Sequence, residues 1–162
     1  MSRIVLDTNG LIQILPQRSK YHRIWESFVE GENVLCVSTE ILNEYLEIMQ
    51  KLINLEVAEY VIKTIINSSF AQFVDPYYHF GLIEADPDDN KFVDCAIAAN
   101  AHFIVTNDHH YNILHQIDFP KVNVINIYDF LDLVINHLFF CEHLCAFGCT
   151  KMKVVGSIFI FF

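Results

Sequence analysis

The chain has 162 residues, the usual size of one domain, and 53% of them are hydrophobic, so one sizeable core can form. Asp and Glu number 20 against 10 Lys and Arg, and the net charge of −10 argues against broad electrostatic binding to nucleic acid or anionic membranes. No apolar run reaches the roughly 20 residues of a membrane-spanning helix, and five cysteines without an amino-terminal signal peptide indicate a reduced, cytoplasmic protein.

Strand and helix patterns alternate along the first half of the chain. Residues 3–6 form a short apolar run typical of a buried strand. The next residues, Asp7, Thr8 and Asn9, are types that cap a helix, which we expect to begin near Gly10. The pattern then predicts a helix over 22–29, a strand over 33–37, an amphipathic helix over 41–52 capped by Ser38, a helix over 57–65 and a strand over 70–74.

The alternation continues in the second half. Residues 86–88 have turn chemistry and lead into a helix over 92–99, and strands are predicted over 103–106 and 122–125, with a helix over 128–134. Short apolar strands that alternate with helices predict an α/β fold with a parallel sheet covered on both faces. In such sheets the ligand crevice lies beyond the carboxyl ends of the strands.

Several carboxylates are placed to meet at that edge. Asp7 and Asp108 each follow an apolar strand, Asp89 lies at the start of the helix before the second of these strands, and Glu44 lies in the first turns of its own helix. Asp94 is more than one turn beyond Asp89 and would point partly elsewhere. Taken singly, Asp7 is more often a helix cap, and an acidic turn such as 86–89 is more often solvated. The combination favours a binding site.

A metal ion would explain why these acids are crowded. Four carboxylates that converge without Lys or Arg repel one another and raise their pKa values. A divalent cation such as Mg²⁺ or Mn²⁺ takes oxygen ligands and bridges to phosphate. It would activate water, offset the charge on a leaving oxygen and supply the positive charge that the chain lacks.

Four stretches carry a family resemblance: VLDTNGLI (5–12), VSTEILNEYLEIM (37–49), DPDDNKFVDCAIAANAHFIVTND (86–108) and VNVINIYDFL (122–131). Together they resemble the PIN-domain family, most closely its branch of VapC-like ribonucleases, the toxins of bacterial toxin–antitoxin pairs. The resemblance implies a three-layer α/β/α sandwich with a central parallel sheet. It also implies a Mg²⁺- or Mn²⁺-dependent endoribonuclease with an RNA substrate, a cognate antitoxin and a tendency to form homodimers.

The resemblance also assigns roles residue by residue. It implies that Asp7, Glu44, Asp89 and Asp108 are the catalytic and metal-binding acids. Thr8, Asn9 and Thr106 match polar positions that arrange the acids and water. Three further acids match less well: Asp88 competes with Asp89 for the third role, Asp94 falls where many members of the branch have an acid, and Glu40 is a weaker rival to Glu44.

Two other function classes stay open at this point. One is a non-catalytic binding or assembly module whose acidic pocket receives a Lys or Arg from a partner; a complete set of acids favours catalysis over it. The other is a phospho-acceptor domain with Asp7 as nucleophile, which would need a second acid beside Asp7 and a later Lys at a strand end. Thr8, Asn9, Thr106 and Asn107 stand at these places instead.

The remaining candidates carry weaker signals. His109, His110 and His115 follow the fourth acid and could act as a base or contact phosphate, although most such histidines are surface residues. Arg18, Lys20 and Arg23 are the expected phosphate contacts.

We expect a PIN domain over residues 1–135 and an apolar extension over 136–162 with no counterpart in the family. A helix there would align His137, Cys141, Cys145 and Cys149, for which packing is a better explanation than a metal site.

Overall fold

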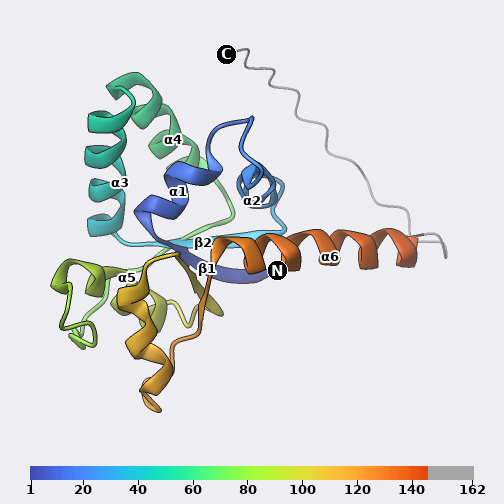
Figure 1. Ribbon diagram of the computed structural model, residues 1–162. Coiled ribbons are helices and arrows are strands. Elements are labelled where there is room, and N and C mark those ends of the chain that lie inside the picture. Colours follow the sequence, from blue (N-terminus) through green and yellow to red (C-terminus); the bar gives the residue numbers. More distant parts are fainter. Residues whose placement is uncertain (146–162) are drawn as a thin grey trace.

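The computed structural model describes the backbone of residues 1–145 and the side chains of residues 1–136 (Figure 1). Each strand and helix predicted above is present, with bounds that differ by a few residues. Two 3-10 helices are additional: η1 lies where a turn was predicted, and η2 has no predicted counterpart. In chain order the elements are β1 (Ser2–Leu6), α1 (Thr8–Ile14), α2 (His22–Val29), β2 (Asn33–Val37), α3 (Thr39–Leu52), α4 (Leu55–Asn67), β3 (Ala71–Phe73), η1 (Pro87–Asp89), α5 (Asn90–Ala98), β4 (Phe103–Val105), η2 (His109–Gln116), β5 (Val124–Ile125) and α6 (Ile127–Cys145).

The five strands form one parallel sheet in the order β3-β2-β1-β4-β5. The helices α1 to α4 lie on one face of the sheet, and α5 lies on the other (Figure 1). The three-layer α/β/α sandwich is thereby confirmed. Because the chain leaves β1 toward β2 but returns to its other side through β4, the strand order reverses between β1 and β4, which is where open α/β sheets bind ligands.

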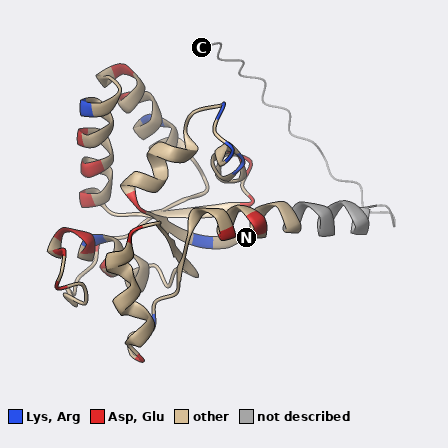
Figure 2. Ribbon diagram, in the orientation of Figure 1, with Lys and Arg blue, Asp and Glu red and all other residues tan. Residues whose placement is uncertain are grey.

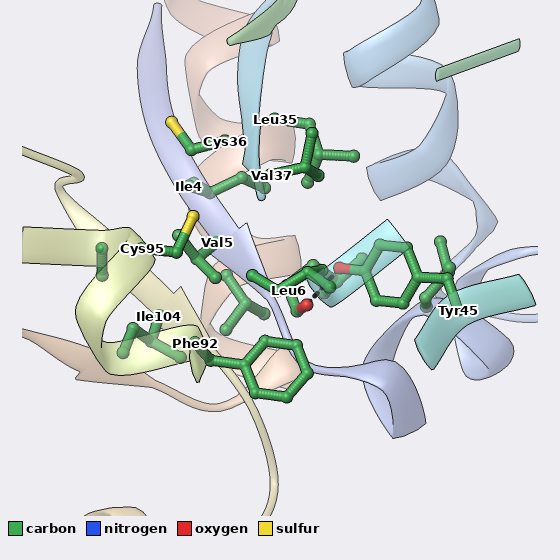
Figure 3. Close-up of a cluster of buried hydrophobic side chains, with 14 of the residues drawn as sticks. Ile4, Val5, Leu6, Leu35, Cys36, Val37, Tyr45, Phe92, Cys95 and Ile104 are labelled. Carbon is green, nitrogen blue, oxygen red and sulfur yellow. Dashed lines mark hydrogen bonds between the residues drawn. The ribbon is translucent and has the colours of Figure 1, made fainter. Parts of the chain in front are cut away.

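The centre of the sheet is apolar on both faces. Ile4, Val5 and Leu6 of β1 are at most 2% exposed, and Figure 3 shows them between side chains from both helical layers. In the same view Tyr45 of α3 reaches the end of β1, where its hydroxyl donates a hydrogen bond to the carbonyl oxygen of Leu6. This contact fixes α3 against the strand end that precedes the first candidate acid.

Among the side chains that the structure describes, the two buried thiols have no disulfide partner. Cys36 and Cys95 are free and fully buried, and burial raises their pKa values to about 11 and about 12. A thiol with such a pKa is protonated at neutral pH and is a poor nucleophile. Both cysteines therefore serve as core residues.

The helix α6 extends through residue 136, at which the extension was predicted to begin. The predicted boundary between a domain over 1–135 and an extension over 136–162 stays a prediction. The row of His137, Cys141, Cys145 and Cys149 lies outside the residues whose side chains are described. In the part of the chain that the structure describes, no helix is both long and apolar enough to cross a membrane.

A candidate metal centre at the sheet edge

The ends of β1 and β4 place two acids around one hydroxyl group. Leu6 pairs with Val105 in the sheet, so Asp7 and Thr106 are the next residues on adjacent strands. The Thr106 hydroxyl donates to Asp7 Oδ2 over 3.0 Å and accepts the backbone N–H of Asp108 over 3.0 Å. Thr106 therefore holds the first and the fourth predicted acids in a fixed arrangement.

Glu44 comes to the same edge from α3, which begins after the cap provided by Ser38. One carboxylate oxygen of Glu44 accepts the Thr8 hydroxyl over 2.5 Å, and the other lies 2.5 Å from Lys91 Nζ. Thr8 is buried, and Lys91 and Glu44 are mostly buried, with side chains 19% and 25% exposed. We expected no Lys or Arg among the converging acids, and Lys91 corrects that expectation.

Asp89 is the acid that η1 turns toward the others. The Tyr111 hydroxyl donates to Asp89 Oδ1 over 3.2 Å, whereas the buried Asp89 Oδ2 has no hydrogen-bond partner among the described residues. The neighbouring Asp88 is exposed, and only its backbone is held, by the side chain of Asp86. The geometry therefore favours Asp89 over Asp88 as the third acid.

Asp94 is buried, but its hydrogen bonds are to the loop before η1 and not to the other acids. Its two carboxylate oxygens accept the backbone N–H of Phe80 over 3.0 Å and contact the His79 ring nitrogen at 3.0 Å. These contacts tie the segment that precedes η1 to the helix α5. Asp94 borders the site, and it positions the loop that carries Asp86 and Asp89.

The acids line one open cleft of about 1050 Å³. Figure 2 shows Asp and Glu in red on α3 and around the start of α5, on opposite sides of the end of β1. The residues that line the cleft are Asp7, Asn9, Glu40, Asn43, Glu44, Glu47, Ile48, His79, Gly81, Asp86, Pro87, Asp88, Asp89, Asn90, Lys91, Asp94 and Asp108. Lys91 is the one Lys or Arg in this described lining, so the cleft is strongly acidic.

Burial and like charges disfavour ionisation of the central acids. The pKa of Asp7 is raised from 3.8 to about 6, chiefly by burial and also by the charges of Asp89 and Glu44, while the hydrogen bond from Thr106 opposes the rise. The pKa of Asp89 is also raised, first by burial and then by Asp86 and Asp108, against the hydrogen bond from Tyr111. A charged Asp7 and a charged Asp89 are thus unfavourable as long as no cation lies between them.

The donor set fits a hard divalent cation. Asp7, Asp89 and Asp108 offer carboxylate oxygens, which Mg²⁺ and Mn²⁺ prefer. Asp89 Oδ2 is buried without a partner, and a buried polar atom in that state is costly. A cation at these acids would satisfy it and relieve the repulsion that raises the pKa of Asp7.

The other predicted site residues lie partly on the wall of the cleft and partly outside it. Asn9 is exposed on the cleft wall and Glu40 also lines it. His109 and His115 are exposed, whereas His110 is half-buried beside the acids. The predicted phosphate contacts Arg18, Lys20 and Arg23 do not belong to the described lining of the cleft, and Arg23 is engaged by Glu30 and Glu32.

Sequence reasoning missed two residues that contact the acids. Lys91 is the first charged residue after Asp89, and its place beside the predicted acids could have indicated that it balances their negative charge. Tyr111 gives no such signal, because its role depends on η2, which brings its hydroxyl to Asp89. His110 was considered only as a base or phosphate contact.

Comparisons with known proteins place this geometry in context. The family model of the PIN domain matches residues 3–110. A DNA-bound VapBC from Salmonella typhimurium is similar in structure, with 21% identity and a TM-score of 0.55 over 78% of this chain and 99% of that chain. VapBC2 from Rickettsia felis, bound to a DNA fragment from their promoter, has 19% identity and a TM-score of 0.54 over 76% of this chain and 98% of that chain. No curated protein matches the sequence.

Proposed function

Since this chain belongs to the PIN domain family, we propose that it is a Mg²⁺- or Mn²⁺-dependent endoribonuclease and the toxin of a toxin–antitoxin pair. The observation that carries the proposal is the convergence of Asp7, Glu44, Asp89 and Asp108, which come from four separate parts of the chain, at one cleft. Crowded carboxylates with raised pKa values are unfavourable in their ionised form unless a cation binds between them. A divalent cation held there would promote hydrolysis of a phosphodiester by activating water and offsetting the charge on the leaving oxygen.

Each acid has a role in the proposal. Asp7, Asp89 and Asp108 would hold one or two cations, and Glu44 would complete the shell or accept a proton from the attacking water. When bound, a cation there would supply the charge that activates water and stabilises the leaving oxygen. Thr106 keeps Asp7 and Asp108 in place, and Thr8 does the same for Glu44.

Lys91 gives the acidic cleft one positive group. Its ammonium group lies on Glu44, and an RNA phosphate that enters the cleft would be a second anion within its reach. Lys91 therefore supports substrate binding in a chain whose net charge is −10. Asn9, exposed on the cleft wall, is available to orient the substrate or water.

The partners follow from the same proposal. The similar structures are VapBC complexes, which supports a cognate antitoxin as the protein partner of this chain. RNA is the proposed substrate, and a homodimer is the proposed assembly. A strongly acidic toxin would bind most readily to an antitoxin that carries a complementary basic segment.

One observation favours a second candidate function. Lys91 shows that the acidic pocket accommodates an ammonium group beside Glu44. A non-catalytic PIN-like module could use the same pocket to receive a Lys or Arg from a partner. The two candidates differ in whether a divalent cation is required for activity.

The test is cleavage of a mixed-sequence single-stranded RNA by the purified chain. Reactions contain Mg²⁺, Mn²⁺ or EDTA, and the wild type is compared with an Asp7→Asn, Asp108→Asn double variant. Asp132→Asn, on the exposed side of α6, is the matched control. Cleavage that needs metal and is lost only in the double variant supports the nuclease. Absence of cleavage and of cation binding would favour the binding module.

A further inference from the structure

A second group of potential ligands lies beside the central acids. Asp86, Asp89 and His110 offer two carboxylate oxygens and one imidazole nitrogen, and these three atoms lie within 4.8 Å of one another. His110 Nδ1 is 3.7 Å from Asp89 Oδ2 and 3.9 Å from Asp86 Oδ2. The group comes from η1 and η2, two elements that are distant in sequence and adjacent in the fold.

Two of these three atoms are buried without a hydrogen-bond partner. They are Asp89 Oδ2 and His110 Nδ1, and they are the only two such side-chain atoms among the residues that the structure describes. The two atoms lie 3.7 Å apart. A buried polar atom without a hydrogen bond is unfavourable, so two of them at one place favour a ligand that binds both.

The spacing fits a metal ion better than a direct hydrogen bond. A protonated imidazole that donated to one carboxylate would bring its nitrogen to about 2.8 Å from the oxygen. Here His110 Nδ1 is roughly equidistant from three carboxylates, since Asp108 Oδ1 is 3.4 Å away. Ligands bound at about 2.1 Å to a tetrahedral metal lie about 3.4 Å apart, so small side-chain movements would close the group around an ion.

We propose that His110, Asp86 and Asp89 form a nitrogen-containing site for a divalent transition metal such as Zn²⁺. An imidazole ligand favours Zn²⁺ and related ions, whereas Mg²⁺ prefers oxygen alone. The site goes beyond the proposed nuclease centre, with which it shares only Asp89. Two backbone contacts preorganise it, because Asp86 caps η1 through Asp88 N–H and Asp108 accepts the His110 N–H over 2.8 Å.

The test is calorimetric titration of the full chain with Zn²⁺ and, separately, with Mg²⁺. His110→Asn is the main variant, and His109→Asn is the matched control because His109 is 82% exposed and adjacent in sequence. We expect His110→Asn to weaken the tightest Zn²⁺ binding by about tenfold or more and to leave Mg²⁺ binding unchanged. His109→Asn should bind Zn²⁺ like the wild type. The other histidines and cysteines are the same in all variants, so differences report on the substituted residue.

A second variant and a direct readout guard against misfolding. Asp86→Asn keeps an oxygen that can cap η1 and removes the charge, and we expect it to weaken Zn²⁺ binding as well. Nitrogen NMR of the imidazoles should show a Zn²⁺-dependent shift of His110 Nδ1. Equal Zn²⁺ affinity in wild type and both variants, or an unshifted His110 Nδ1, would overturn the proposal. Neither readout depends on RNA cleavage, so failure of the nuclease proposal would be seen separately in the cleavage assay.

Discussion

Replacing Asp7 by Asn should stabilise the metal-free protein. Asp7 is 5% exposed, and burial together with Asp89 and Glu44 raises its pKa from 3.8 to about 6. The Asn side chain still offers an oxygen to the Thr106 hydroxyl, so the hydrogen bond over 3.0 Å can be kept. What the substitution removes is the cost of an ionised carboxylate in this place.

The size of the effect follows from the pKa difference. Each pKa unit corresponds to about 1.4 kcal/mol, so the rise from 3.8 to about 6 makes ionised Asp7 cost about 3 kcal/mol of stability. Because the folded state has the higher pKa, this cost is absent below pH 3.8, grows as the pH rises toward 6 and is complete above it. Asp7→Asn should therefore gain about 3 kcal/mol near pH 7.5 and about half of that near pH 5.

Urea denaturation in EDTA, followed by circular dichroism at both pH values, measures the gain. Asp132→Asn, an exposed Asp in the same chain, is the control and should change stability little at either pH. The reasoning is refuted if Asp7→Asn is no more stable than wild type near pH 7.5, or if its advantage is as large near pH 5. If Asp7 is a metal ligand as proposed, saturating Mn²⁺ should stabilise the wild type more than the variant, because the ion would bind the folded state through Asp7.

Two further perturbations test other parts of the structure. Lys91→Gln removes the ammonium group that lies 2.5 Å from Glu44, and calorimetry should show about threefold to tenfold tighter Mn²⁺ binding, or about 0.7–1.4 kcal/mol; unchanged or weaker binding would argue that Lys91 does not compete with the cation. Gly31 has φ +77°, and a Cβ there would lie 2.3 Å from the Phe70 ring, so Gly31→Ala should cost about 2–4 kcal/mol in urea denaturation. Gly81→Ala, with φ +60° and no atom within 4 Å of its Cβ, should cost only about 1 kcal/mol, and equal losses would contradict the steric argument.

The fold could be predicted from sequence because its strands are short continuous apolar runs and its helices have regular apolar faces. Strands such as Asn33–Val37 match their predicted bounds. The convergence of Asp7 and Asp108 followed from one topological fact, that parallel strands end at the same edge. Local apolar patterns were therefore sufficient to predict most of the strands and helices.

The details of the site depended on contacts that no local pattern encodes. The position of Lys91 on Glu44 requires the start of α5 to approach α3. The hydrogen bond from Tyr111 to Asp89 requires η2, whose 3-10 geometry has no apolar period of the kind that reveals a helix. Asp94 could be predicted to point partly elsewhere, but its partners Phe80 and His79 belong to a loop whose path the sequence leaves open.

The hydrogen bond from Thr106 to Asp7 spans 99 positions of the chain, which has a consequence for synthesis on the ribosome. A nascent chain that ends before β4 has emerged contains Asp7 and Glu44 but lacks the strand that orders them. Long-range strand pairing of this kind forms late, because the intervening loop must first be closed. Translation that stops before β4 has been made would therefore yield a fragment with no assembled acidic centre, and the proposed activity would arise only after β4 has paired with β1.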